Sequence, residues 1–414
     1  MSVLEKIDSE GIIALENKYG AHNYHPLPVV LSRGEGVYVW DVEGKKYYDF
    51  LSAYSAVNQG HCHPKIVGAM INQAQTLTLT SRAFYNDQLG PYEEYLTNYF
   101  GFDKVLPMNT GAEAVETAIK LCRKWAYEVK GIAEKQAEII VCDGNFHGRT
   151  TTIISFSNDE NARKNFGPYT EGFIKIPYDS IEVLELTLQS SANIAGFLVE
   201  PIQGEAGVYV PSEGYLTKAK ALCEKYNVLF IADEVQTGIA RTGKLLAVDH
   251  ENVKPDILIL GKAISGGVYP VSAVLANDAI MNVIKPGQHG STFGGNPVAA
   301  AVAVAALEVV KEENLAQNAE ALGQIFRRKI GDYIINSSIA TMVRGKGLLN
   351  AIVINDTEES ETAWNICLAL RDNGLLAKPT HGNIIRFAPP LVMNEEQLLD
   401  CISIIIKTLK QFEK

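Results

Sequence analysis

Apolar and polar positions alternate between about residues 100 and 280 in a pattern typical of strands and helices that follow one another. Amphipathic spacing predicts helices over residues 111–124 and 214–226, because their apolar residues recur every three or four positions. Around them, short apolar runs predict buried strands at residues 138–142, 152–156, 195–200, 228–234, 256–260 and 271–276. This alternation favours an α/β domain with a mainly parallel, doubly wound sheet.

The two ends of the chain show a different pattern. Residues 37–50 predict two strands joined by a turn at Glu43 and Gly44. Asn296 and Pro297 together form a favourable helix start. Beyond this point the pattern predicts strands at 347–354 and 383–391, and helices at 360–373 and 394–412.

The length of the chain also indicates two domains. Its 414 residues, 47% of them hydrophobic, exceed what one core usually organises. We expect a large α/β domain over residues 51–297. A smaller α+β domain would flank it, built from both ends of the chain, residues 1–50 and 298–414.

The net charge of the chain and the length of its longest apolar run limit the kinds of partner that it can bind. The chain has 48 acidic against 37 basic side chains and a net charge of -11, which disfavours nucleic acid or an anionic membrane as the main partner. The longest apolar run, residues 298–307, is much shorter than the roughly 20 residues that cross a bilayer. A buried helix explains this run better.

The cysteines and histidines give little sign of a metal site or of disulfides. Six cysteines are scattered without a CxxC pair, so neither a zinc ribbon nor a disulfide scaffold is indicated. His61, Cys62 and His63 could suggest metal ligands, but a structural loop is favoured and we expect no metal. The first residues, MSVLEKIDSEG, resemble neither a signal nor a transit segment, so we expect a cytoplasmic protein.

Polar side chains directly after the predicted strands are the first candidates for chemistry, because ligands of open α/β sheets collect there. Glu200, Asp233 with Glu234, and Lys262 occupy such positions. Each alone has an ordinary explanation, since a lysine there usually points to water and an aspartate caps the next helix. Together they fit a pyridoxal phosphate site, which needs a lysine for the aldehyde and a carboxylate for the pyridine nitrogen.

A phosphate cradle would complete such a site. Residues 109–112, NTGA, open the amphipathic helix, and a helix start offers free N–H groups and a positive dipole end to an anion. An ordinary helix cap is the alternative explanation. The small residues of GKAISGG, which begins at Gly261, would allow the backbone to approach a cofactor closely.

Several motifs occur in the order found in one family. The chain resembles the class III pyridoxal-phosphate aminotransferases in NTGAEAVETA, NFHGRT, EPIQGEAG, LFIADEVQTG, LGKAISGG and HGSTFGGNP. Within that class it is similar to the ornithine aminotransferases in YGAHNYHPLPV, SAYSAVNQGHCHP, SRAFYN, RGKGLLNAIVI and KPTHGNIIRFAPPL. The resemblance implies the two-domain fold type I of pyridoxal phosphate enzymes. It covers most of the chain.

For the cofactor, the resemblance implies a role for each matching residue. Lys262 would form the Schiff base, and Asp233 would pair with the pyridinium nitrogen. Gln236 would contact the phenolic oxygen, while Phe146 and Val235 would enclose the ring from both sides.

The phosphate would be held at two places. The resemblance implies backbone contacts from Gly111 and Ala112. Ser291 and Thr292 of a neighbouring subunit would complete the cradle, which implies a homodimer with active sites shared between subunits.

For the substrates, the resemblance implies five contacts. Tyr24 and Arg149 would bind the α-amino-carboxylate end of ornithine, and Tyr54 would lie along its methylene groups. Glu205 and Arg386 would form an ion pair that opens for 2-oxoglutarate, which carries two carboxylates.

The implied reaction is a ping-pong transfer of the δ-amino group of ornithine to 2-oxoglutarate. Its products would be glutamate and glutamate 5-semialdehyde, which cyclises to pyrroline-5-carboxylate. An aminotransferase for acetylornithine or 4-aminobutyrate is the nearest alternative, and Tyr24 and Tyr54 argue against it. A non-catalytic regulator that binds pyridoxal phosphate is a further alternative. Such a regulator would not need Lys262, Arg149, Glu205 and Arg386 together. His147 receives no role.

Overall fold

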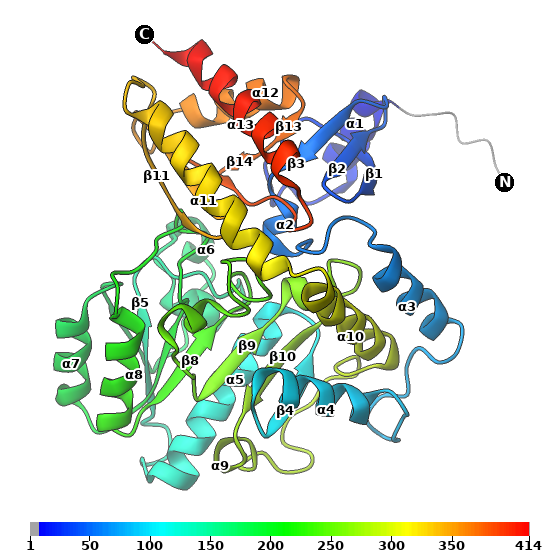
Figure 1. The fold of residues 1–414 in the computed structure, drawn as a ribbon. Helices are drawn as coiled ribbons and strands as arrows, with labels where there is room; N and C mark the ends of the chain where they lie inside the picture. The colour runs from blue at the N-terminus through cyan, green and yellow to red at the C-terminus, as the bar shows by residue number, and fades with distance from the viewer. Residues whose placement is uncertain (1–7, 414) are drawn as a thin grey trace.

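The computed structural model describes residues 8–413, which form two lobes (Figure 1). The larger lobe is built on a seven-stranded sheet in which β10 alone runs antiparallel to its neighbours. All other adjacent strands of this sheet pair in parallel, as the sequence predicted. In spatial order the strands are β4 (Lys104–Met108), β10 (Ser272–Ala276), β9 (Ile257–Leu260), β8 (Leu229–Asp233), β7 (Ile194–Val199), β5 (Glu138–Cys142) and β6 (Phe173–Ile176).

Both faces of this sheet are covered, which explains why its central strands are apolar throughout rather than alternating. On β8, Phe230 packs into the core shared with α7 and α8, whereas the next residue, Ile231, packs into the core shared with α5. The sheet is therefore doubly wound. The surrounding helices are α3 (Pro64–Ala74), α4 (Leu89–Phe100), α5 (Gly111–Trp125), α6 (Glu160–Arg163), α7 (Ile181–Ser190), α8 (Tyr215–Lys225), α9 (Asp278–Met281) and α10 (Pro297–Glu312).

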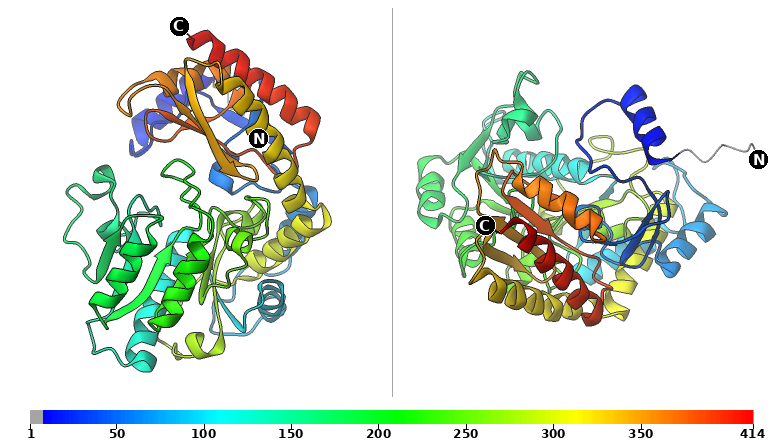
Figure 2. Two further views of the ribbon diagram at one scale, coloured as in Figure 1. Left: turned by 60° about the vertical axis from the view of Figure 1, so that its left-hand side comes forward. Right: turned by 90° about the horizontal axis from the view of Figure 1, so that it is seen from above.

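The smaller lobe joins the two ends of the chain (Figure 2). One of its sheets has the order β1 (Leu31–Glu35), β2 (Tyr38–Asp41), β3 (Lys46–Asp49) and β13 (Leu375–Leu376). Because β13 pairs in parallel with β3, residues of the C-terminal part complete a sheet begun near the N-terminus. A second sheet has the order β11 (Ala340–Lys346), β12 (Leu349–Ile354), β15 (Ile384–Phe387) and β14 (Lys378–Pro379).

The helices of this lobe cover the two small sheets, and Figure 2 shows the N-terminal elements in blue beside the C-terminal ones in orange and red. They are α1 (Ser9–Tyr19), the short turn α2 (Ser52–Ser55), α11 (Leu315–Ile334), α12 (Thr362–Asp372) and α13 (Glu395–Leu409). Domain boundaries at residues 50 and 297 stay a prediction. Within residues 8–413, every helix is too short or too polar to span a bilayer.

One predicted strand is wrong. Residues 152–156 form a 3-10 helix, Ile153–Phe156, whose apolar side chains enter the core beside α5. A short apolar run fits a buried helical turn as well as a strand, and the pattern alone does not separate the two. The two edge strands of the sheet, β4 and β6, were not among the strands predicted from the sequence.

We expect Asn296→Ala to destabilise the protein by about 1 kcal/mol, because Asn296 is the N-cap of α10. Its side chain accepts from the Ala299 N–H at 2.9 Å and donates to the Phe293 carbonyl at 2.7 Å. Urea unfolding of the cofactor-free protein at fixed concentration measures the loss. Asn296→Ser, whose hydroxyl can also cap the helix, should retain more of the stability than Asn296→Ala, and equal losses in both variants would contradict this role.

Candidate active site

A pocket of about 180 Å³ lies at the carboxyl ends of the parallel strands. Glu200 follows β7, Asp233 ends β8, and Lys262 follows β9 after a single glycine. Phe146 and His147 come from the loop after β5. The predicted convergence of polar side chains at this edge of the sheet is therefore present in the structure.

The backbone holds Lys262 in an uncommon conformation. Its φ of 46° lies in the left-handed region, which residues other than glycine adopt at a cost. Gln59 donates to the carbonyl of the next residue, Ala263, at 2.9 Å and so fixes this turn. Burial lowers the pKa of Lys262, against the opposing charge of Glu205. A larger share of neutral amine suits a lysine that acts as nucleophile or base.

The contact between His147 and Asp233 was not predicted from the sequence. Its Nδ1 lies 2.6 Å from Asp233 Oδ2, while Asp233 Oδ1 accepts from the Val235 N–H at 3.0 Å. Burial alone would lower the pKa of His147, but the bond to Asp233 raises it above its usual value. Because a carboxylate only accepts, the proton of this short contact belongs to Nδ1. His147 therefore orients the carboxylate at the base of the pocket.

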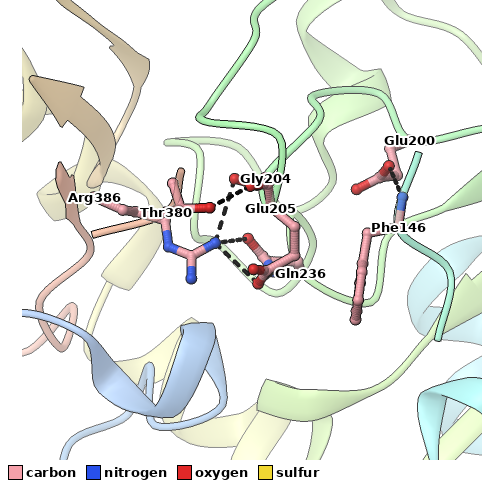
Figure 3. A network of polar contacts seen from close by, with 7 residues as sticks. All are labelled: Phe146, Glu200, Gly204, Glu205, Gln236, Thr380 and Arg386. Carbon is pink, nitrogen blue, oxygen red and sulfur yellow. Dashed lines mark hydrogen bonds and ion pairs between the residues drawn. The ribbon is translucent and has the colours of Figure 1, made fainter. Parts of the chain in front are cut away.

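Glu200 fixes the position of Phe146. The Phe146 N–H donates to Glu200 Oε2 at 2.9 Å, and Figure 3 shows the phenylalanine ring extending away from this bond. Burial raises the pKa of Glu200 to about 7. A buried carboxylate thus holds the loop that carries Phe146 and His147.

The predicted phosphate cradle is a well-formed helix start. Thr110 caps α5 and exchanges hydrogen bonds with Glu113, which leaves the first N–H groups, of Gly111 and Ala112, directed out of the helix. A Cβ on Gly111 would lie 2.9 Å from Val235 Cγ1, so this close approach requires glycine. The first turn of the helix and the Val235 side chain thus border the same pocket.

Ser291 and Thr292 lie at the surface near this helix start. Asn109, just before the cradle, donates from Nδ2 to Ser291 Oγ of the same chain at 2.8 Å. The next residue, Thr292, is exposed.

Arg386 and Glu205 form an ion pair, as predicted (Figure 3). One guanidinium nitrogen, Nη1, donates to Glu205 Oε1 at 3.0 Å and to Gln236 Oε1 at 3.2 Å. Gln236 Nε2 in turn donates to Glu205 Oε1 at 3.2 Å. Burial alone would raise the pKa of Glu205, but the charges of Arg386 and Lys262 lower it. The ion pair with Arg386 therefore favours the ionised form of Glu205.

Thr380 supports this pair, although no role was predicted for it from the sequence. Its hydroxyl donates to the Glu205 backbone carbonyl at 2.5 Å (Figure 3). Thr380 lies between β14 and β15, the hairpin that carries Arg386. The hairpin therefore carries one member of the ion pair, Arg386, and binds the backbone of the other, Glu205. Its place in the motif KPTHGN was the available signal.

Tyr54 lies under Arg386, with the guanidinium carbon 4.9 Å from the ring centre. It belongs to α2, a turn whose residues 52–55 all have positive φ. Asp49 Oδ1 holds this turn by accepting from the N–H groups of Leu51 and Ser52 at 2.8 and 2.9 Å. Burial and the charge of Glu205 raise the pKa of Tyr54. A strained turn thus presents the tyrosine to the pocket.

Tyr24 and Arg149 lie farther out than the other predicted substrate residues. Tyr24 is 70% exposed, although it is near enough to raise the pKa of Tyr54. The Arg149 side chain is 59% exposed, 3.9 Å from Asp159 and 5.8 Å from the centre of the Phe146 ring. Neither residue lines the buried pocket. Both are exposed, and Arg149 already faces the carboxylate of Asp159.

Comparison with known proteins assigns this site to a family. The model of the class-III aminotransferases matches residues 19–409. The chain belongs to the class-III aminotransferase family. A class-III aminotransferase from Drosophila melanogaster, named mitochondrial ornithine aminotransferase, is 64% identical over 97% of this chain and 92% of its own length.

Two solved structures have the same fold. The ornithine aminotransferase of Toxoplasma gondii, which has pyridoxal phosphate at partial occupancy in its active site, is 49% identical with a TM-score of 0.96. That match covers 99% of this chain and 95% of the other. The acetylornithine aminotransferase of Elizabethkingia anophelis is 67% identical with a TM-score of 0.91, over 98% of this chain and 100% of the other.

As a class-III aminotransferase, the protein uses pyridoxal phosphate, and its pocket fits this cofactor. An amine with a lowered pKa, a buried carboxylate and the open end of a helix suit an aldehyde, a pyridine nitrogen and a phosphate. His61 and His63, considered above as metal ligands, bind different carboxylates, Asp49 at 2.7 Å and Glu313 at 2.9 Å. Residues 8–413 contain no cluster of three or more side chains able to hold a metal ion.

We expect His147→Phe to destabilise the cofactor-free protein by about 1–3 kcal/mol, because Asp233 Oδ2 loses its buried partner. Urea unfolding should show that this cost largely disappears when Asp233 is also changed to Ala. His147→Asn, whose amide can donate in place of Nδ1, is the matched control. An equal cost of His147→Phe in both backgrounds would show that the ring only fills space.

Proposed function

We propose that the protein transfers the δ-amino group of ornithine to 2-oxoglutarate and releases glutamate 5-semialdehyde and glutamate. The observation that carries this proposal is the pairing of Arg386 with Glu205 beside Lys262. The named activity of the Drosophila melanogaster relative, 64% identical over nearly the whole chain, supports it.

The ion pair accounts for which amine of ornithine reacts. Ornithine has an amine beside its carboxylate and a second one at the far end of the side chain. An unpaired Arg386 near Lys262 would attract the carboxylate and bring the α-amine to the reacting position. With Glu205 in place, the charge of Arg386 is neutralised, so the end of the substrate that carries the δ-amine and no carboxylate can approach.

The carboxylate of ornithine would then bind at the entrance. We assign it to Arg149, whose planar guanidinium can hold a carboxylate through two parallel bonds. Tyr24 would bind the same end of the substrate, and Tyr54 would line the path of the methylene groups.

The second substrate needs the opposite arrangement, since 2-oxoglutarate carries a carboxylate at each end. Arg149 would hold the remote carboxylate, and Arg386 the one beside the reacting carbon. Glu205 is a quarter exposed and meets Arg386 through only one nitrogen, so it can leave the pair without unfolding its loop.

The bound cofactor supplies an aldehyde that takes up the amino group and a ring that accepts the electrons of a broken C–H bond. Lys262 would hold the aldehyde and, once released by substrate, move a proton from the δ-carbon to the cofactor carbon. Asp233, oriented by His147, would keep the proton on the pyridine nitrogen.

The remaining residues would hold the cofactor in place. Phe146 and Val235 border the pocket from two sides and would enclose the ring, and Gln236 would reach its phenolic oxygen. Gly111 and Ala112 would bind the phosphate through their N–H groups.

A homodimer would complete the cradle. We propose that Ser291 and Thr292 of one subunit face the phosphate of the other. The large aromatic side chains Phe84, Tyr85 and Phe293 are exposed in the single chain. Their exposure supports the proposal that a second subunit covers this part of the surface. A cytoplasmic location of this protein stays a prediction, because the Drosophila melanogaster relative is named as a mitochondrial protein.

An aminotransferase for acetylornithine is the second candidate, because a protein of that name is 67% identical to this chain. Acetylornithine keeps the δ-amine but carries an acetyl group on the α-nitrogen, so the two substrates differ only at the entrance. Steady-state rates with ornithine, acetylornithine and 4-aminobutyrate, each with 2-oxoglutarate, decide between the activities. Preference for acetylornithine would overturn the proposal.

We expect Lys262→Ala to abolish turnover while the protein still binds the cofactor without a covalent bond, through Asp233 and the helix start of α5. Borohydride reduction of the unmodified holoenzyme, followed by peptide mapping, locates the attachment. Attachment to any lysine other than Lys262 would disprove the assignment.

We expect Glu205→Ala to shift the first half-reaction from ornithine toward glutamate. Arg386 is only 3% exposed, and removing one member of a buried pair costs about 3–5 kcal/mol. The partial exposure of Glu205 reduces this figure, but a shift of 1.4 kcal/mol already changes a rate ratio about tenfold. Single-turnover rates with both amines measure it, and Glu205→Gln separates charge from shape. An unchanged ratio in both variants would mean that Glu205 does not control the choice.

A further inference from the structure

Arg241 is fully buried, and none of the roles proposed above for the pocket requires a cation at its position. Its guanidinium donates from Nε to Asn58 Oδ1 at 3.1 Å. From Nη1 it donates to the carbonyls of Leu348 at 3.0 Å and Pro389 at 2.7 Å. All of these acceptors are neutral oxygen atoms. The nearest charges that act on the group are Asp49 and Arg386, and neither is a hydrogen-bond partner.

A cation in such surroundings destabilises the folded state. Burying a charge without a paired carboxylate costs several kcal/mol, and well-packed apolar side chains are often more stabilising. Burial lowers the pKa of Arg241 to about 9, so the group is still protonated at neutral pH. General stability therefore does not explain an arginine here, whereas a need for donors in several directions does.

The acceptors of Arg241 belong to chain segments that lead to the substrate residues. Asn58 follows the turn that carries Tyr54, and Pro389 follows the strand β15 that carries Arg386. Leu348 immediately precedes β12, the strand paired with β15. Arg241 itself belongs to the loop after β8, which also carries Gln236. One side chain thus ties three segments of the site together.

Further hydrogen bonds run from these segments back to the loop of Arg241. Asn58 Nδ2 donates to the Ile239 carbonyl at 2.8 Å, and the Leu391 N–H donates to the Asn58 carbonyl at 2.7 Å. The Leu348 N–H donates to the Arg241 carbonyl at 3.1 Å. The loop of Arg241, the segment after Tyr54 and the segment after Arg386 therefore hold one another through both side chains and backbone.

Two of the joined segments have strained backbones. Residues 52–55 have positive φ, and so do Ile239 at 54° and Ala240 at 71°. Left-handed φ is unfavourable for residues other than glycine and most of all for a β-branched residue such as isoleucine. Such conformations persist only where surrounding contacts enforce them. Asp49 holds the first of these segments, and Asn58, the acceptor of Arg241, holds the second through the Ile239 carbonyl.

We propose that Arg241 is a positioning residue for substrate binding, which holds Arg386 and Tyr54 in register with Gln236 and Glu205. It touches neither substrate nor cofactor. Its bonds set the place of the Arg386 guanidinium and thereby the affinity for the carboxylate beside the reacting carbon. The inference rests on the proposed function, because that function assigns the carboxylate to Arg386.

Binding of glutarate to the holoenzyme tests this inference without any chemical turnover. Glutarate has the two carboxylates of 2-oxoglutarate but no group that reacts. Its dissociation constant can be measured from the change in cofactor absorbance or from competition with 2-oxoglutarate. We expect Arg241→Met, which keeps the length of the side chain, to weaken glutarate binding at least tenfold. KM for 2-oxoglutarate should rise more than the rate of the ornithine half-reaction falls.

Two further variants separate positioning from stability. Asn58→Ala removes one acceptor and keeps the arginine, so we expect glutarate to bind at least threefold more weakly; this variant decides the matter if Arg241→Met does not fold. Leu398→Ala, a buried change in α13 away from these bonds, should lower the melting temperature and leave glutarate binding unchanged. The inference is overturned if the folded Arg241 and Asn58 variants match Leu398→Ala, with lower melting temperatures and unchanged glutarate binding. Turnover of ornithine by the unmodified protein tests the proposed function separately.

Discussion

The contact between Arg386 Nη1 and Glu205 Oε1, 3.0 Å long, is the interaction on which the rest of the site depends. A buried guanidinium beside a reactive lysine would attract any carboxylate, so it must be neutralised whenever the substrate brings an amine on an apolar chain. Glu205 satisfies this need and remains partly exposed. In the proposed reaction the pair would open for 2-oxoglutarate, so that one pocket would receive two substrates that differ in charge.

The surrounding structure keeps several unfavourable groups in place around this pair. Lys262 and Tyr54 both have left-handed φ, His147 and Asp233 share a short buried contact, and Arg241 lies in the interior among neutral oxygens. Each arrangement costs free energy, and each is enforced by contacts from another part of the chain. Burial of the apolar side chains on both faces of the large sheet stabilises the fold and offsets the free-energy cost of these arrangements.

The sequence predicted those parts of the fold and site that have local signals. Buried strands are apolar throughout, so the residues that follow them, such as Asp233 and Lys262, could be singled out, and motif resemblance added Glu205 and Arg386. Contacts between distant residues left no local signal, which is why the bond of His147 to Asp233 and the bonds of Arg241 were not predicted. Periodicity also failed at residues 152–156, where a short apolar run became a 3-10 helix.

The most direct test of the account is a crystal structure of the holoenzyme with glutarate bound. Glutarate offers a carboxylate to Arg386 and cannot react, so the complex shows whether the ion pair opens for a dicarboxylate. The account predicts that a glutarate carboxylate binds Arg386 and that Glu205 moves beyond about 4 Å, the limit of an ion pair. A complex in which Glu205 stays on Arg386 while glutarate occupies the site would contradict it.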